Sequence, residues 1–171
     1  VWECSSISTL ELVWNKIAWG KKSKRERMKD QALFCSQVAG TNKLEFLKWA
    51  REVKHCEWDA VTIDEAACFG NLEMLKYCFS NGCPCDKNAS CKEAACEGHL
   101  DCLRFLFDKL KPSRKTEKEA ALEAAADGHL DIVKYFVEER KIWDDLKFYC
   151  LEKAARYGKL DCIKYLVEEA K

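Results

Sequence analysis

A seven-residue phrase recurs four times along this chain of 171 residues, at near-constant spacing. Each copy has a pair of alanines, two variable residues, a glycine, one variable residue and a leucine. The copies span Ala66–Leu72, Ala94–Leu100, Ala124–Leu130 and Ala154–Leu160, so their leucines are 28, 30 and 30 residues apart. A degenerate fifth copy around Val38–Gly40 and Leu44 lies 28 residues before the first. A repeat this regular predicts a stacked array and favours a binding scaffold over a globule with one central core.

Composition indicates the secondary structure of such an array and the classes of partner that it does not attract. Apolar residues make up 48% of the chain, whereas only two prolines and seven glycines are present to form strand turns. An all-helical protein is therefore expected. The 29 basic and 29 acidic residues cancel, which gives no global attraction to nucleic acid or an anionic membrane. No apolar run approaches the roughly 18 residues that could span a bilayer, so no membrane insertion is expected.

Several of the twelve cysteines occupy positions that hold small or apolar residues in other copies. Cys96 corresponds to Ala126, and Cys102 corresponds to Ile132. Cysteine in this role is common where thiols stay reduced, which predicts an intracellular compartment, either cytoplasm or nucleus. An organelle reached after precursor processing stays open. The chain begins at Val1 without a signal peptide, which indicates a processed form, a recombinant product or a fragment.

Each copy is expected to form two short helices. The first contains the alanine pair and ends at the glycine, which can adopt the left-handed conformation that closes a helix. The second begins at the leucine and has a buried stripe three residues on, at Leu47, Leu75, Leu103, Val133 and Ile163. Five residues on lies an aromatic row that is expected to stack between repeats, at Trp49, Tyr77, Phe105, Tyr135 and Tyr165.

Charges also recur in the second helix. Its second residue is always acidic and its fifth is always basic, as in Glu73 and Lys76. An acid in the first turn suits the helix dipole, and the base three residues later can pair with it. We interpret the pattern as a solvated face, with a charged recognition stripe as the alternative.

These phrases resemble ankyrin repeats. The family's Ala-Ala-x-x-Gly-His-Leu stretch, with the acidic, apolar and basic residues that follow, is matched at Ala94–Arg104 and Ala124–Lys134. A divergent group with shortened repeats is the nearer match, because a Cys-Pro-Trp-Asp-like phrase recurs after the second helix. It stands as Cys56-Glu57-Trp58-Asp59, as Cys83-Pro84-Cys85-Asp86 and as Ile142-Trp143-Asp144. The family's Thr-Pro-Leu-His opening is missing, and short repeats leave less room for long finger loops.

The resemblance implies an all-α, ankyrin-type solenoid of about five helix-turn-helix repeats with an N-terminal capping helix. We expect a capping helix and basic segment in residues 1–30 and the array in 31–171, with repeats at about 31–58, 59–86, 87–114, 115–144 and 145–171. An amphipathic helix over 8–19, with Leu10, Val13, Trp14 and Ile17 on one face, would form the cap. By resemblance, His99 and His129 would bond backbone between repeats.

The sequence contains no phosphate loop, nucleophile elbow or helical zinc motif. The nearest metal candidate is Cys83, Cys85, Cys91 and Cys96, but their spacing differs from paired zinc ligands. We therefore predict no enzyme, no metal, no cofactor and no small-molecule substrate.

The predicted function is a scaffold that binds another protein through its concave side, made of first helices and loops. The candidate contact residues, transferred by repeat position, are Asp64, Glu65, Phe69, Lys92, Glu93, Glu97, Glu123, Asp127, Glu152, Lys153 and Tyr157. Trp58 and Trp143 are expected to pack within their loops. The alternative is an accessory subunit of a large RNA-containing or other assembly, docked through the basic segment 21–29. A solvated linker or helix start is the simpler interpretation of that segment.

Overall fold

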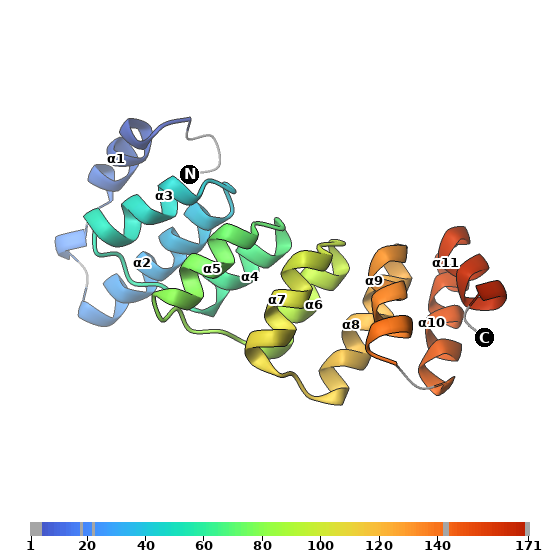
Figure 1. The fold of residues 1–171 in the computed structure, drawn as a ribbon. Helices are drawn as coiled ribbons and strands as arrows, with labels where there is room; N and C mark the ends of the chain where they lie inside the picture. Colours follow the sequence, from blue (N-terminus) through green and yellow to red (C-terminus); the bar gives the residue numbers. More distant parts are fainter. Residues whose placement is uncertain (1–4, 18, 22, 142–143, 170–171) are drawn as a thin grey trace. The chain divides into compact units, whose positions relative to one another are not determined.

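The computed structural model describes residues 5–17, 19–21, 23–141 and 144–169. All regular secondary structure in these ranges is helical, which confirms the all-α class. The chain divides into two compact units, Val1–Asp86 and Lys87–Lys171. Helices come in consecutive pairs within each unit, as the repeated phrase predicts (Figure 1).

The first unit contains a leading helix and two helix pairs. Its elements are α1 (Ile7–Lys16), the short 3₁₀ turn η1 (Trp19–Lys21), α2 (Lys24–Ala39), α3 (Leu44–Lys48) with the π-helical continuation η2 (Trp49–Val53), α4 (Ala60–Cys68) and α5 (Leu72–Ser80). The first helices α2 and α4 pack against each other, and each packs against its own second helix.

Helix α1 covers the first helix pair. The Ser6 hydroxyl accepts a hydrogen bond from the Thr9 amide at 3.2 Å and caps the helix. Leu10 is fully buried, and the Trp14 ring lies edge-on to Phe34, with the ring centroids 5.2 Å apart. These contacts confirm an N-terminal capping helix. The helix ends at Lys16 rather than residue 19, because the backbone of Ile17 is extended.

The basic segment 21–29 is mostly the beginning of a helix. Ser23 caps α2 and forms a capping box with Glu26, whose side chain accepts from the Ser23 amide at 2.9 Å. The cations from Lys24 to Lys29 therefore lie on the first turns of α2. Lys22 lies outside the described residues.

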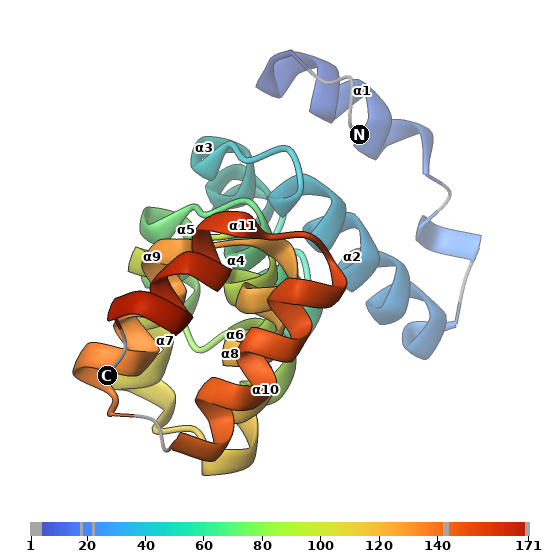
Figure 2. The ribbon, with the colours of Figure 1, turned by 90° about the vertical axis from the view of Figure 1, so that its right-hand side faces the viewer.

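The second unit contains three helix pairs in two layers. Its elements are α6 (Lys87–Cys96), α7 (Leu100–Leu110), α8 (Arg114–Asp127), α9 (Leu130–Lys134) with η3 (Tyr135–Glu139), α10 (Asp144–Arg156), and α11 (Leu160–Lys164) with η4 (Tyr165–Glu169). The first helices α6, α8 and α10 pack in sequence to form one layer, and each also packs on its second helix (Figure 1). Figure 2 shows α10 and α11 lying next to each other.

Glycine closes the first helix where the phrase predicts it. Gly98 has φ +80° and Gly128 has φ +87°, both left-handed. The degenerate first copy differs, because three residues instead of one separate Gly40 from Leu44. Gly40 has a right-handed φ of −62°, and Asn42, with φ 59°, supplies the left-handed residue. Asparagine tolerates this conformation better than most residues with a side chain.

His129 has the structural role that the resemblance implies. Its Nε2 atom lies 2.6 Å from the carbonyl oxygen of Cys96, in the preceding repeat. The ring also lies directly over Gly98, where a Cβ atom would be 2.5 Å from Nδ1. The histidine therefore bonds backbone between repeats and needs a residue without a side chain beneath it.

The core follows the predicted stripes. Leu47, Leu75 and Leu103 are fully buried, and Val133 is nearly so, whereas Ile163 is half-buried. Cysteines fill core positions as small apolar residues, as predicted, and those with at most 1% exposure are Cys35, Cys56, Cys78, Cys91, Cys102, Cys150 and Cys162.

The recurring loop phrase holds the connection between repeats. The thiols of Cys56 and Cys83 lie 3.2 Å and 3.4 Å from the carbonyl oxygens of Gln31 and Asp59, to which they donate. The Asp59 side chain also caps α4 by accepting from the Val61 amide at 3.2 Å. The same phrase therefore supplies the thiol that bonds the loop to the preceding repeat and the aspartate that caps the next helix. These two roles explain structurally why the phrase recurs.

Trp58 packs within its loop, as expected. The Arg51 guanidinium lies 4.0 Å from its ring centroid, and the Tyr77 ring lies edge-on to it at 6.2 Å. In the third loop phrase, Ile142 and Trp143 lie outside the described residues.

The aromatic row packs differently from the expected ring-on-ring stacking. A cation from the preceding repeat lies over the ring: Lys48 over Tyr77 at 5.7 Å, Arg104 over Tyr135 at 4.5 Å and Lys134 over Tyr165 at 5.2 Å. The base precedes the aromatic residue by one position in every second helix, so neighbouring helices bring base and ring face to face.

The charged pairs within second helices form only in part. Lys76 contacts Glu73 at 2.7 Å, as predicted. Arg104 instead pairs with Glu139 of the following repeat through two hydrogen bonds. The recurring charged residues therefore form two kinds of contact. Some pair within one helix, and others contact the neighbouring repeat.

Candidate functional site

Metal-ligand clusters and membrane-spanning helices are absent from the described residues. No group of three or more histidine, cysteine, aspartate or glutamate side chains in them could hold a metal ion. None of the helices in these ranges is long and apolar enough to cross a membrane. The remaining candidate is the surface of the first helices and the turns after them. The helix-one surface comprises Asp64, Glu65, Phe69, Lys92, Glu93, Glu97, Glu123, Asp127, Glu152, Lys153 and Tyr157.

In the first unit, the helix-one surface is a short stretch of α4. Asp64 and Glu65 are half-buried on the helix, and Phe69 is its C-terminal cap. The Phe69 ring is 40% exposed although its backbone is fixed by a 3.0 Å hydrogen bond from its amide to the Glu65 carbonyl. An apolar ring is therefore exposed at the end of the helix that carries these two acidic residues.

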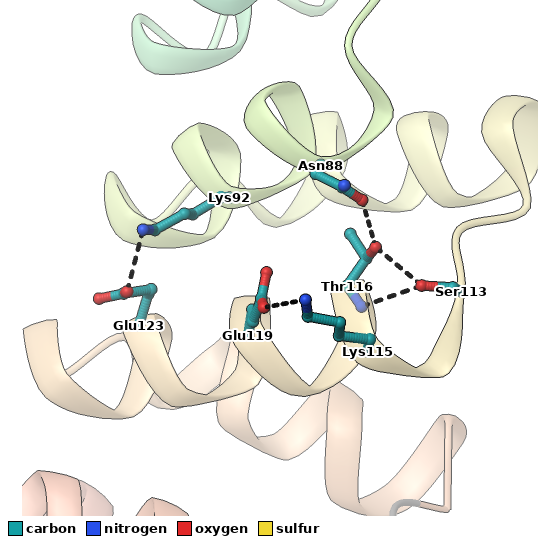
Figure 3. A network of polar contacts seen from close by, with 7 residues as sticks. All are labelled: Asn88, Lys92, Ser113, Lys115, Thr116, Glu119 and Glu123. Carbon is teal, nitrogen blue, oxygen red and sulfur yellow. Dashed lines mark hydrogen bonds and ion pairs between the residues drawn. The ribbon is translucent and has the colours of Figure 1, made fainter.

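In the second unit, α6 and α8 present a predominantly acidic stretch. Lys92 pairs with Glu123 at 3.3 Å across the two helices, and this hydrogen bond raises the pKa of the lysine (Figure 3). Glu97 and Asp127 are exposed at the helix ends, and Glu93 is half-buried. Since the lysine is already paired, the carboxylates at the helix ends dominate this stretch.

The thiol of Cys96 belongs to the same stretch but is a poor nucleophile. Burial raises its pKa to about 12, with a further contribution from its hydrogen bond to Asp127 at 3.2 Å. A thiol with this pKa is neutral at physiological pH and acts as a hydrogen-bond donor. The contact fixes the position of the Asp127 carboxylate at the end of α8.

On α10 the surface changes from acidic to aromatic. Glu152 is exposed and pairs with Arg156 at 3.1 Å, while Lys153 is half-buried. The Tyr157 side chain, which follows the helix, is 56% exposed. The two aromatic members of the helix-one surface, Phe69 and Tyr157, therefore both protrude.

Sequence reasoning missed two exposed rings on α10. Phe148 and Tyr149 are 65% and 44% exposed, and the Lys118 ammonium lies 4.5 Å from the Tyr149 ring centroid. Tyr149, Lys153 and Tyr157 are four residues apart, so they form one stripe along the helix. The four-residue spacing is visible in the sequence, whereas the exposure of the Tyr149 side chain is not.

A polar network between α6 and α8 was missed as well (Figure 3). The Thr116 hydroxyl donates to the Asn88 side chain, and Ser113 caps α8 by accepting from the Thr116 amide at 3.3 Å. Lys115 lies 3.9 Å from Glu119 on the same helix. Two of the contacts in Figure 3, Asn88 with Thr116 and Lys92 with Glu123, connect the neighbouring first helices α6 and α8.

Comparisons with known proteins agree with the geometry. The family model described as "Ankyrin repeats (3 copies)" matches residues 63–144 and 93–171. Ankyrin repeats generally mediate protein–protein interactions and are typically non-catalytic modules. Searches of curated proteins and of solved structures returned no match. The matches cover well over half of the chain, and the helix–glycine–helix geometry recurs within them. The chain belongs to the ankyrin-repeat family.

Proposed function

We propose that this protein is a non-catalytic scaffold that binds a partner protein through the helix-one surface. The proposal rests on the stripe of Tyr149, Lys153 and Tyr157 along α10 and the turn that follows it, where the two tyrosine rings protrude. Tyrosine presents a large, rigid contact area and is enriched among residues that dominate binding energy. The buried residues Leu146, Cys150 and Ala154 hold α10 in place, and none of them belongs to this stripe.

The charge of the surface indicates the chemistry of the partner. The α6 and α8 stretch has exposed Glu97 and Asp127, and the Lys92 cation is neutralised by Glu123. A partner segment with basic residues next to an apolar one complements this arrangement of carboxylates and rings. Phe69, together with Asp64 and Glu65, offers the same combination in the first unit.

Comparative affinity capture tests the proposal. The full chain and the variant Tyr149→Ala/Tyr157→Ala are used as baits in native extract, and bound proteins are quantified by mass spectrometry. We expect at least one protein to be lost with the double variant and retained with Val53→Ala, which removes a 60% exposed side chain at the end of η2. If every bound protein is captured equally by all three baits, the surface assignment is wrong.

Docking through the basic segment is the second candidate. Lys24, Arg25 and Lys29 are exposed on the first turns of α2, so they are available to phosphate groups. The test is RNA binding at several salt concentrations, with charge reversal of these three residues. A steep salt dependence that disappears in the variant supports this candidate, and equal binding by both proteins contradicts it.

We also propose an intracellular compartment. The observation in favour is that cysteines occupy packed core positions as thiols, such as Cys78 and Cys91, where a disulfide would disturb the packing. Localisation of the tagged protein in its native cell tests this proposal, and secretion contradicts it.

A further inference from the structure

A pocket of about 420 Å³ lies between the second helices of the second unit, on α7 and η3. Two of its lining residues are the rings of Phe107 and Tyr135, which are nearly buried. Three others are cations, Arg104, Lys111 and Arg140, all of them exposed. The pocket therefore combines aromatic surface with positive charge and has no residue in common with the helix-one surface.

The two arginines are held in place by internal partners. Arg104 lies 4.5 Å from the Tyr135 ring centroid and forms hydrogen bonds to Glu139. Arg140 lies 5.4 Å from the Phe107 ring centroid and pairs with Glu117. Both guanidinium groups are thus preorganised against rings, and their charges are largely balanced by carboxylates.

Lys111 is the pocket cation whose charge is not balanced by a paired carboxylate among the described residues. It makes no ion pair within the part of the chain that the structure describes. Asp108, which also lines the pocket, already faces Lys109 at 3.7 Å. After the internal pairs are counted, one unneutralised ammonium group remains at the edge of an aromatic pocket.

The position of Lys111 follows from the way α7 ends. Lys111 adopts a left-handed conformation with φ 48° and ψ 62°, and Pro112 cannot continue the helix. The two residues therefore form the edge of the pocket. Lys141 occupies the corresponding position one repeat later, with φ 49°, but does not line the pocket.

We propose that this pocket binds a short peptide segment in which an anionic side chain lies next to an apolar one. The anion pairs with the Lys111 ammonium, and the apolar side chain packs against Phe107 and Pro112. The anion can be a carboxylate or a phosphoryl group, since both form ion pairs with lysine. The pocket size is within the range of ligand sites. A nucleic acid is disfavoured, because a single unneutralised ammonium group cannot neutralise a continuous run of phosphates.

The first experiment titrates the isotope-labelled full chain with three blocked peptides and follows backbone amide NMR shifts. The probes are acetyl-Gly-Leu-Glu-Phe-Gly-amide and the same peptide with phosphoserine or glutamine in place of glutamate. We expect shifts around Lys111 and Arg140 with an anionic peptide, and about tenfold weaker binding of the glutamine peptide. Preference for glutamate or phosphoserine identifies the source of the anion. Equal binding of all three peptides, no binding, or shifts confined to other elements overturn the proposal.

The second experiment removes the cation without disturbing the fold. Lys111→Gly suits the left-handed conformation, so its melting temperature should equal or exceed that of the parent protein. Lys141→Gly is the matched control, because it makes the same substitution in the same conformation outside the pocket. We expect Lys111→Gly to weaken binding of the anionic peptide about tenfold and Lys141→Gly to leave it unchanged. Unchanged binding by Lys111→Gly, or equal loss in both variants, contradicts the assignment.

Discussion

His129 lies so close over Gly98 that a Cβ atom on the glycine would be 2.5 Å from the Nδ1 atom of the ring. The same ring reaches the carbonyl oxygen of Cys96 at 2.6 Å. The glycine is therefore required for two reasons, its left-handed backbone and the space that the next repeat occupies. A substitution here disturbs both the turn and the contact between repeats.

Gly98→Ala should destabilise the protein by more than the backbone conformation alone explains. A left-handed alanine costs roughly 1–2 kcal/mol, and displacing His129 from its backbone partner adds about 1 kcal/mol. Gly158→Ala is the control, since Gly158 has φ +68° but a Cβ atom there would have no described neighbour within 4 Å. The measurement is denaturant unfolding of both variants. Equal losses would show that the histidine simply moves aside.

Lys159→His should stabilise the last repeat. Lys159 occupies the position of His129 one repeat later, and its side chain runs over Gly128, 2.9 Å from where a Cβ atom on that glycine would lie. A histidine at this position can reach the carbonyl of Ala126, the residue that corresponds to Cys96. The expected gain is about 1 kcal/mol, from one hydrogen bond between repeats. Lys159→Gln controls for the lost charge, and a gain of the same size in both variants would argue against the hydrogen bond.

The contribution of Glu139 should depend on pH. The hydrogen bonds from Arg104 hold the pKa of this carboxyl below its usual value. Because the pKa is lower in the folded state, the stabilisation is present at pH values above the unfolded pKa and is lost as pH falls through the folded one. Glu139→Gln should lower the melting temperature at neutral pH. In strong acid, where the Glu139 carboxyl is protonated in the folded and in the unfolded protein, the substitution should have no effect. A difference between the two proteins that stays constant over this range would be inconsistent with the pair.

Thr62→Val should stabilise the first unit. Thr62 is fully buried in α4, and its hydroxyl has no hydrogen-bond partner among the described residues. Valine has nearly the same shape, so the substitution removes an unsatisfied group at little packing cost, with a gain of about 1 kcal/mol. Ser36→Ala is the contrasting variant, because the buried Ser36 hydroxyl donates to the Leu33 carbonyl at 2.9 Å. Thermal unfolding should move in opposite directions for the two variants, and a destabilised Thr62→Val would refute the reasoning.

Local spacing accounts for what could be predicted. The alanine pairs, the glycine turns and the apolar stripes each depend on helical periodicity and on the conformational freedom of one residue, and both can be read along the chain. Leu103 and Ala124 are fully buried for this reason. The prediction of a left-handed glycine is wrong at Gly40, and the cause is again local. Two extra residues precede Leu44, and the left-handed residue is Asn42.

The candidate site was only partly predictable. Repeat position identified Tyr157 and Phe69 as protruding rings, but it did not identify Tyr149, which has no aromatic counterpart in other repeats. Burial of a side chain depends on what the neighbouring helix presents, and one helix pattern does not contain that information. The binding role of these residues stays a prediction.

The sequence by itself determined the helix pairs, their order and the residues that form their cores, because these follow from periodicity within each repeat. Only the tertiary structure decided which groups meet between repeats. It placed Arg104 over Tyr135 rather than next to an acid of its own helix, and Lys111 at the edge of a pocket. Such contacts depend on the distance and angle between neighbouring helices, which are set by the packing of many side chains at once.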